Sequence, residues 1–242
     1  MAAVLVFGGL NALRVLGASL ASAMLSEILA GRLFQKKAHL EDGNTVLIGI
    51  LLGLILPVNL ASWKIILAGF VSVFLAKEIF GGTGAYLFNP ALVGFGFLML
   101  CFPQFSYQNL LIVTNPWAFK IFAGTLLLGG LTLMGQKLIA WEIPVFYLLP
   151  FWGLDFLLHG QNQITILLNV SLLAAFYFLA DSAALPMSRT GKRLFAVFSG
   201  LLGALLGLVQ PGAQAICFSL LVLNAATPWL DGCFKPKIAA NL

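Results

Sequence analysis

Apolar runs, separated by short groups of Gly, Pro and charged residues, account for nearly all of the chain. A helix needs about 20 apolar residues to cross the hydrocarbon core of a bilayer, and many of the runs approach this length. The pattern therefore predicts an all-α fold, a polytopic membrane helical bundle of about nine spans. The predicted spans cover residues 11–33, 45–60, 62–80, 88–102, 117–134, 143–158, 164–179, 194–209 and 213–230.

The composition supports a membrane setting. Hydrophobic residues make up 61% of the chain, charged residues 9%, and the mean hydropathy is +1.02, whereas charged residues reach about 25% in soluble domains. Because no polar linker or low-complexity tract separates a soluble module, we expect a single integral membrane domain over residues 1–242. The start of the chain has no basic region followed by an A-x-A-like cleavage site, so we expect no removable signal peptide.

One interruption of the apolar pattern is more informative than the others. Residues 80–94 read Phe-Gly-Gly-Thr-Gly-Ala-Tyr-Leu-Phe-Asn-Pro-Ala-Leu-Val-Gly, a glycine-rich break and an Asn-Pro pair between apolar segments. One interpretation is an ordinary connecting loop, since Gly and Pro punctuate helices. We favour a broken or re-entrant element that lines a site inside the bundle, because non-helical backbone at membrane depth persists only where protein or water satisfies it.

Positive charges are distributed unevenly over the predicted loops. Loops rich in Lys and Arg stay on the cytoplasmic side, and an outer N-terminus with a cytoplasmic C-terminus puts ten of the thirteen positive residues at cytoplasmic ends. These ten are Arg32, Lys36, Lys37, Lys77, Lys137, Arg189, Lys192, Arg193, Lys235 and Lys237. We therefore interpret the net charge of +5 as a signal for topology and for contact with the lipid bilayer, and we expect no nucleic-acid partner.

Four acidic residues fall near the ends of predicted spans, where pairing with lipid headgroups is the ordinary explanation. We adopt that explanation for Glu27 and Asp155. Glu78 and Asp181 each end a helix beside an irregular segment, an arrangement that can place a carboxylate at the mouth of a cavity. The three cysteines and two histidines show no ligand spacing, so we assign no metal site.

A weak internal similarity links the two halves of the chain. A pair of apolar spans around an irregular loop occurs within residues 45–102 and again within 164–230, and Phe88-Asn89-Pro90 has a loose counterpart at 223–228. This similarity predicts an inverted repeat, a feature common in transporter-like folds. Chance similarity within an apolar chain is the alternative.

The ordered set of motifs resembles the RnfD/NqrB family of membrane subunits from ion-translocating electron transport complexes. The most specific part combines Ala76-Lys77-Glu78-Ile79-Phe80-Gly81-Gly82-Thr83-Gly84 with Phe88-Asn89-Pro90-Ala91-Leu92-Val93-Gly94. Leu40-Glu41-Asp42-Gly43-Asn44-Thr45 precedes it, and Trp141-Glu142-Ile143-Pro144-Val145, Asp181 and Gly191-Lys192-Arg193-Leu194 follow in the same order. The chain is more similar to RnfD than to the longer NqrB.

The resemblance implies a subunit that carries flavin and couples electron flow to the movement of Na⁺ or H⁺. In the family, a D-x-x-S/T-G/x-A-T motif in an outward-facing insertion carries FMN on its threonine. Here the insertion is nearly absent, and Thr114 is the candidate attachment residue. Gln108, Leu111 and Val113 replace the aspartate, serine and alanine of the motif, so an ordinary loop threonine is the alternative.

Five further residues are candidates for cofactor binding by the same resemblance. Gly81, Gly82 and Gly84 would allow a cofactor or a partner helix to approach the backbone, because they have no Cβ. Asn89 would offer its amide to the broken backbone or to a flavin edge, and an N-cap role before a proline is compatible with this. Asp181 keeps the carboxylate of the family's T-D-P-x-T pattern, or caps the backbone of its own loop.

Two functions from different classes follow. The first is a membrane subunit of an Rnf/Nqr-like electron transport complex in the plasma membrane, with other membrane subunits as partners and FMN as a cofactor. Such a chain is an enzyme only as one subunit of a translocase. The second is a flavin-free, channel-like or structural membrane protein on the same scaffold, because a fold does not fix a function. The altered motif around Thr114 argues against flavin, and the glycine-rich break fits both functions; we favour the first.

Overall fold

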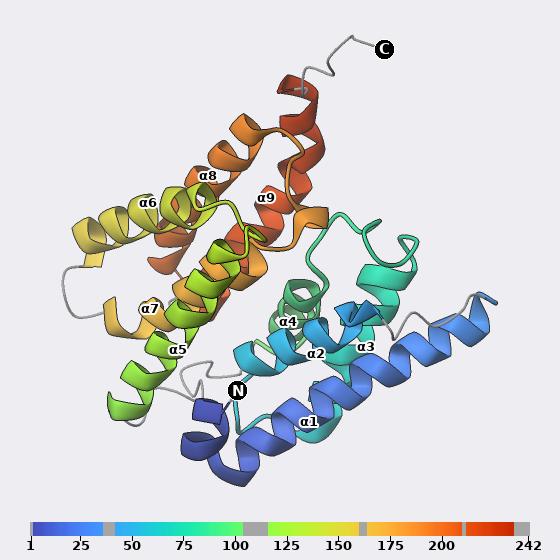
Figure 1. Ribbon diagram of the computed structural model, residues 1–242. Helices are drawn as coiled ribbons and strands as arrows, with labels where there is room; N and C mark the ends of the chain where they lie inside the picture. Colours follow the sequence, from blue (N-terminus) through green and yellow to red (C-terminus); the bar gives the residue numbers. More distant parts are fainter. Residues whose placement is uncertain (1, 36–41, 104–115, 160–163, 210–211, 235–242) are drawn as a thin grey trace.

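The computed structural model describes residues 2–35, 42–103, 116–159, 164–209 and 212–234, and every regular element in these ranges is helical (Figure 1). The elements are α1 (Ala2–Leu33), α2 (Asn44–Ile55), α3 (Ser62–Phe70), the π-helical η2 (Val71–Glu78), α4 (Pro90–Cys101), α5 (Pro116–Gly135), α6 (Glu142–His159), α7 (Ile164–Leu173), the π-helical η5 (Ala174–Phe178), the 3₁₀ turn η6 (Ser182–Ala184), α8 (Arg189–Gly207) and α9 (Ala213–Cys233). Each predicted span corresponds to one α-helix, so the all-α bundle is confirmed over the described ranges.

The helices differ in their ability to cross a membrane. Among the described residues, Gly9–Leu33 and Ala213–Cys233 are long and apolar enough to do so alone. Helices α2 and α4 have 12 residues each, about 18 Å at 1.5 Å per residue, against a hydrocarbon core of about 30 Å. Neither helix can cross alone, so both are partial helices.

The start of α4 lies halfway along α9. The side-chain oxygen of Asn224 accepts a hydrogen bond from the backbone N–H of Asn89 at 3.1 Å, and Asn224 is the twelfth of the 21 residues of α9. Cys217 Sγ donates to the carbonyl of Leu92 at 3.4 Å, so α4 runs antiparallel to the first half of α9. The glycine-rich break therefore ends deep in the bundle, which confirms the predicted broken element.

Small residues allow the helices to pack closely. Gly49 and Gly53 of α2 face α1, where a Cβ added to Gly53 would lie 2.5 Å from Ser19 Oγ. Gly200 of α8 faces α6, and a Cβ there would lie 2.5 Å from the carbonyl oxygen of Tyr147. Small residues at such contacts are typical of membrane helices. In Figure 1, α1 to α4 occupy one part of the molecule and α6, α8 and α9 another.

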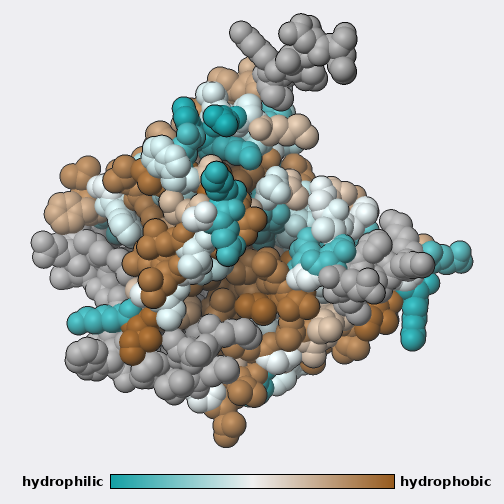
Figure 2. All heavy atoms as spheres, viewed as in Figure 1, coloured by the Kyte–Doolittle hydropathy of each residue, from teal (hydrophilic) through white to brown (hydrophobic). Residues whose placement is uncertain are grey.

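The outer surface suits contact with lipid. Figure 2 shows that hydrophobic residues cover much of one face, while hydrophilic residues gather in separate patches. Large apolar side chains such as Leu128 and Leu157 are exposed along helix surfaces. Exposed Trp63, Trp141 and Trp229 lie close to the ends of helices, as expected for side chains at the two membrane–water interfaces.

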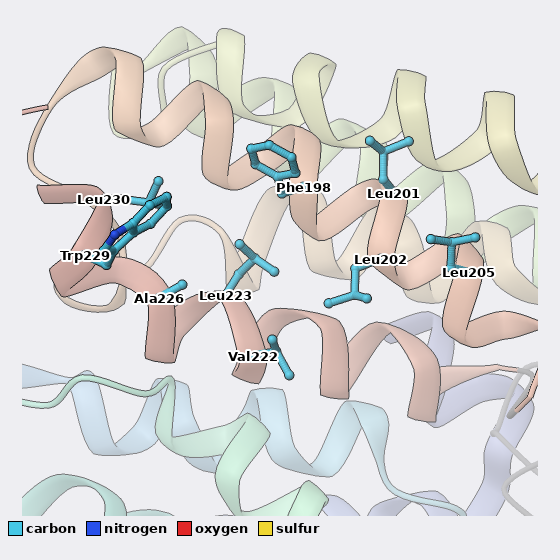
Figure 3. Close-up of a pocket in the computed structure, with 9 residues that line it drawn as sticks. All are labelled: Phe198, Leu201, Leu202, Leu205, Val222, Leu223, Ala226, Trp229 and Leu230. Atoms are coloured by element: carbon cyan, nitrogen blue, oxygen red, sulfur yellow. The ribbon is translucent and has the colours of Figure 1, made fainter. Parts of the chain in front are cut away.

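An apolar groove of about 480 Å³ runs between α8 and α9 (Figure 3). Phe198 and Leu205 line it from α8, and Val222 and Trp229 line it from α9. The described lining contains only aliphatic and aromatic residues, so it offers little to orient a polar ligand. We therefore assign the groove to the lipid-facing surface and not to the functional site.

Candidate functional site

Glycines shape the loop between η2 and α4. Gly81, Gly82 and Gly84 have φ angles of 119°, 98° and 84°, which residues with a Cβ rarely adopt. The N–H of Gly82 donates to the carbonyl of Lys77 at 3.1 Å, and the N–H of Ala85 donates to that of Gly82 at 3.2 Å. These glycines therefore serve the turn itself. A Cβ added to Gly84 would meet nothing within 4 Å, so no partner helix approaches there in the described part of the chain.

Asn89 performs two tasks at the start of α4. Its Oδ1 accepts hydrogen bonds from the N–H groups of Ala91 at 3.1 Å and Leu92 at 3.4 Å, which confirms the predicted N-cap. Its Nδ2 donates to Asp181 Oδ2 at 3.3 Å. Because Pro90 has no N–H and the next two N–H groups are capped, the start of α4 is satisfied without an outside anion.

Asp181 lies in the connecting segment between η5 and α8. Its Oδ1 accepts hydrogen bonds from the Tyr86 hydroxyl at 3.1 Å and from the N–H of Ala183 at 3.2 Å, so it also caps η6. Burial raises the pKa of Asp181 above its ordinary value, against the lowering effect of these two donors. Burial, and then the charge of Asp181, raise the pKa of the Tyr86 hydroxyl.

Three partners of this junction were not expected from the sequence. Tyr86 is 4% exposed and joins Asp181 to Asn44, whose Nδ2 donates to the Tyr86 hydroxyl at 3.4 Å. Asn224 accepts from the N–H of Asn89, and its Nδ2 donates to the carbonyl of Ala184 at 3.1 Å. The loose similarity of residues 223–228 to the Asn-Pro site pointed toward Asn224, whereas no sequence signal distinguished Asn44.

A cavity of about 730 Å³ opens beside the junction. Its polar wall comes from Asp42, Asn44, Tyr86, Asn89 and Asp181. Its apolar wall comes from α2 and from Leu133, Leu138 and Ile139. A second, mainly apolar cavity of about 410 Å³ adjoins it between α2 and α5.

Two of the six predicted site residues, Asn89 and Asp181, thus meet at one cavity. Gly81, Gly82 and Gly84 lie in the neighbouring loop but do not line it, and Thr114 lies outside the described residues.

The wall of the larger cavity does not fit the phosphate of FMN. Its described lining contains the carboxylates of Asp42 and Asp181 and no Lys, Arg or His. A phosphate needs cationic side chains or unpaired backbone N–H groups. The free N–H groups at the start of α4 already donate to the side chain of Asn89. The lining suits a neutral polar group, a proton or a small cation.

A second polar cluster lies within the bundle, near the base of the glycine-rich loop. Lys77 Nζ is 2.6 Å from Glu27 Oε2 and donates to Thr45 Oγ1 at 2.7 Å. Lys77, Glu27 and Thr45 are 0%, 2% and 1% exposed. Pairing with lipid headgroups, expected for Glu27, is therefore wrong, because its carboxylate pairs inside the protein. Asp155 is buried as well, and Lys77 does not act as a loop charge.

An exposed ion pair joins the start of α6 to the start of α8. Arg193 donates from Nε to Glu142 Oε2 at 2.7 Å and from Nη2 to Glu142 Oε1 at 2.8 Å. The hydrogen bonds from Arg193 lower the pKa of Glu142, and they raise the pKa of the Arg193 guanidinium. This bidentate geometry is the stronger form of a surface ion pair.

Comparison with known proteins identifies the family of the chain. The family model described as NQR2, RnfD, RnfE family matches residues 1–117 and 104–240. The D subunit of the ion-translocating oxidoreductase complex of Methanosarcina acetivorans is 30% identical over 248 residues, covering 98% of this chain and 86% of the relative. The D subunit of the Na⁺-translocating ferredoxin:NAD⁺ oxidoreductase complex of Acetobacterium woodii is 27% identical, with 95% of this chain and 83% of the relative covered.

A third relative is the D subunit of the proton-translocating ferredoxin:NAD⁺ oxidoreductase complex of Clostridium ljungdahlii. It is 26% identical, and the alignment covers 94% of this chain and 84% of the relative. The relatives thus differ in the ion that their names give, while the alignments extend over most of each protein. Because the family model matches nearly the whole chain, the chain belongs to the NQR2, RnfD, RnfE family.

Proposed function

We propose that this chain is a membrane subunit of an Rnf-type, ion-translocating electron transport complex, in which residues 1–242 form one membrane domain and other membrane subunits are partners. The relatives named above are D subunits of such complexes. The observation that carries the proposal is the junction at Asp181, where the loops that follow η2 and η5 meet at a cavity.

Each residue of the junction has a distinct role in this proposal. Asp181 holds a proton or a monovalent cation at the cavity wall, as ionisable groups within membrane bundles commonly do. The hydroxyl of Tyr86 and the amide of Asn89 orient its two oxygens. Leu47 and Leu51 line the facing wall. Their apolar side chains offer no polar group to the bound proton or cation, so it stays at the carboxylate of Asp181.

The test measures electron transfer and ion uptake together. Inverted membrane vesicles carry the complex with wild-type or variant chain, and ferredoxin-dependent NAD⁺ reduction is followed beside ion uptake. Asp181→Asn should lower ion uptake about tenfold, the usual effect of losing one charged hydrogen-bonded group, with unchanged amounts of protein. Asp231→Asn is the matched control, because Asp231 accepts a hydrogen bond from the N–H of Met187 and does not line the cavity. Unchanged uptake in Asp181→Asn would contradict the proposal.

A flavin-free structural or channel-like protein is the second candidate, favoured by the altered motif around Thr114. It predicts that deletion of the chain removes the complex from the membrane, while Asp181→Asn leaves coupled ion uptake intact.

We propose further that Thr114 is not flavinylated, or only poorly so. A flavin transferase must hold the acceptor segment in an extended form, with small residues beside the threonine and a carboxylate upstream. Leu111 and Val113 are bulky, Gln108 is neutral, and Pro116 stiffens the exit. Coexpression with a flavin transferase should therefore leave the intact mass of the chain unchanged. A stoichiometric gain of one FMN that disappears in Thr114→Val would overturn this proposal.

For the cellular location we propose the plasma membrane, with an outer N-terminus and a cytoplasmic C-terminus. Lys137 follows α5 and precedes Leu138 and Ile139 of the cavity wall. Arg189 begins α8, whose Arg193 pairs with Glu142 at the start of α6. Arg14 donates to the carbonyls of Val58 and Leu60, in the loop at the other end of α2. The more basic end of the bundle supports this orientation.

A further inference from the structure

The cavity beside Asp181 and the smaller apolar cavity share part of their walls. Gly43, Leu47, Leu51 and Tyr177 line both of them. The volumes are about 730 Å³ and about 410 Å³, and ligand sites in proteins commonly measure about 300–1,000 Å³. The two adjoining cavities are therefore far larger than a proton or a single ion requires.

The wall changes from polar to apolar along α2 and α5. Asn44 at the start of α2 lines the larger cavity, whereas Ile50 and Leu54 line only the smaller one. On α5, Leu133 near the end of the helix lines the larger cavity, and Phe122 lines the smaller one. The stretch from Asn44 to Leu54 spans about 15 Å at 1.5 Å per residue, half of a hydrocarbon core of about 30 Å. This length corresponds to one leaflet of a bilayer.

The polar end of this space opens at the surface. Asp42 and Ser182 line it and are exposed. Trp141, which is 60% exposed, lies two residues after Ile139 of the cavity wall, and tryptophan is enriched at the membrane–water interface. The polar end therefore lies at the level of the lipid headgroups, and the apolar end extends into the hydrocarbon layer.

The charge at the polar end selects its occupant. The carboxylates of Asp42 and Asp181 line it, and its described lining contains no Lys, Arg or His. Asp181 Oδ2 accepts a hydrogen bond from Asn89 Nδ2 alone among the described groups, so it can accept another. An ammonium group with N–H donors fits these oxygens. A quaternary ammonium has no N–H to donate, and an anionic group is repelled.

The apolar end suits a hydrocarbon chain. Its two hydroxyl groups bond within the protein, because Thr125 donates to the carbonyl of Phe122 at 2.8 Å and Tyr177 donates to that of Leu126 at 3.5 Å. The groove between α8 and α9 is also apolar, but it has no polar end among its described residues. Only the space between α2 and α5 thus matches both the head and the tail of a lipid, among the cavities described above.

We propose that the two adjoining cavities bind one phospholipid with a primary amine headgroup, such as phosphatidylethanolamine. Its ammonium donates to Asp42 at the mouth and faces Asp181 behind it, and one acyl chain fills the apolar cavity. Lys137, which is exposed directly before Leu138 of the wall, contacts the lipid phosphate. The inference deepens the proposed function by naming an occupant of the same cavity, and it rests on that function for the membrane setting of the chain.

The test measures lipid binding by the purified full-length chain. The chain is stripped of lipid in detergent and supplied with dioleoyl phosphatidylethanolamine, phosphatidylcholine or phosphatidylglycerol at equal mole fraction. The ethanolamine lipid should raise the melting temperature by about 5 °C or more above the other two, because a ligand that binds only the folded state stabilises it. Native mass spectrometry should show one retained molecule of this lipid. Equal shifts with the three lipids would overturn the proposal, since an ordinary lipid-facing surface does not distinguish headgroups.

Two variants at exposed positions locate the binding. Leu47 lines both cavities and is 53% exposed, so Leu47→Trp should fill the passage between them without disturbing the core, and it should remove the response to the ethanolamine lipid. Leu157→Trp on α6 is the matched control, because Leu157 is 79% exposed and lines neither cavity. Asp42→Asn should reduce the preference for ethanolamine over choline. Full retention of the preference in both Leu47→Trp and Asp42→Asn would place the lipid elsewhere and overturn the proposal.

These variants leave Asp181 in place, so the two proposals can fail separately. A preference for the ethanolamine lipid together with unchanged ion uptake in Asp181→Asn would contradict only the proposed function. Loss of ion uptake in Asp181→Asn without any lipid preference would contradict only the lipid site.

Discussion

Single residues in this protein are predicted to respond to pH with opposite signs. Burial raises the pKa of Asp181 above 3.8, so its folded state binds the proton more tightly than the unfolded state does. The contribution of Asp181 to stability is therefore greatest at low pH and is lost as the pH rises through the folded pKa. Arg193 lowers the pKa of Glu142 below 4.5. The contribution of Glu142 to stability is therefore lost as the pH falls through this lowered pKa.

Melting curves over about pH 3 to 7 check these signs. Asp181→Asn should gain melting temperature relative to the wild type as the pH rises. Glu142→Gln should lose a little over the same rise, because an exposed ion pair is screened by solvent and contributes little. A difference in melting temperature that is the same at every pH reflects lost hydrogen bonds. The test is therefore how the difference between variant and wild type changes with pH. A pH-independent difference between Asp181→Asn and the wild type would contradict the prediction.

Glycines in this chain are required for two different reasons. The sequence pattern alone predicts that alanine or valine is worse at Gly82 and Gly84 than at Gly200 or Gly203. The structure corrects this. At Gly84, with a φ of 84° and open space, alanine costs backbone strain of about 1–3 kcal/mol. At Gly200 the new Cβ would lie 2.5 Å from the Tyr147 carbonyl, so α6 and α8 must separate.

We therefore expect Gly200→Ala to lower the melting temperature at least as much as Gly84→Ala. Gly153→Ala is the control on the exposed side of α6, because a Cβ there meets nothing within 4 Å, and alanine improves helix propensity by about 1 kcal/mol. Equal melting temperatures for Gly200→Ala and Gly153→Ala would show that α6 and α8 tolerate the extra atom.

At the scale of elements, the apolar pattern predicted the helices well but not their ends or their inner geometry. The predicted span 45–60 is longer than α2, because Leu56 is extended before Pro57 and a residue before proline avoids helical geometry. The π-helical pairing of η2 left no trace in the sequence. Over eight residues it barely alters the apolar period.

The candidate site was only partly predictable for a related reason. Asn89 and Asp181 stood out because each interrupts an apolar run. Their contact, and that of Asp181 with Tyr86, joins residues 92 and 95 positions apart. No local pattern encodes such a distance, so the roles of Tyr86 and Asn44 became visible only in the folded chain, and Asn224 was indicated only by the loose similarity of residues 223–228.

The link between α4 and α9 can be tested at Asn224. Asn224→Ala removes the side chain that bonds both groups. The N–H of Asn89 then loses its Asn224 partner, whereas the carbonyl of Ala184 keeps the hydrogen bond from the Thr227 hydroxyl. A buried polar group left unpaired costs about 1–3 kcal/mol, so the melting temperature should fall by several degrees. Asn59→Ala, at an exposed position, is the control. Equal melting of the two variants would argue against a structural role for Asn224.

At the scale of the whole molecule, the ends of several helices lie around one cavity. The lining residues near helix ends are Asp42, Gly43, Asn44, Tyr86, Asn89, Leu133, Leu138, Ile139, Ala180, Asp181 and Ser182. They lie beside the starts of α2, α4 and η6 and the ends of α5 and η5. The loops that follow η2 and η5 therefore meet each other at this cavity. An inverted repeat stays a prediction, whereas the contact between the two loops gives the halves a shared site.

The same arrangement allows the orientation in the membrane to be tested at described positions. Arg189 is exposed at the start of α8, and Asn59 is exposed in the loop between α2 and α3. If the more basic end is cytoplasmic, a reagent that cannot cross the membrane should label Asn59→Cys in intact cells. It should label Arg189→Cys only after the membrane is opened.

The labelling needs a background without the native cysteines, Cys101, Cys217 and Cys233. Gln108→Cys, which lies outside the described residues, should behave like Asn59→Cys if residues 103–116 face outward, and Lys36→Cys should behave like Arg189→Cys. All four cysteine variants are compared in this one background. Labelling after the membrane is opened shows whether each cysteine can react at all, so a lack of labelling in intact cells reports the side of the membrane. Labelling of Arg189→Cys but not of Asn59→Cys in intact cells would reverse the orientation and place the Asp181 cavity toward the outer side.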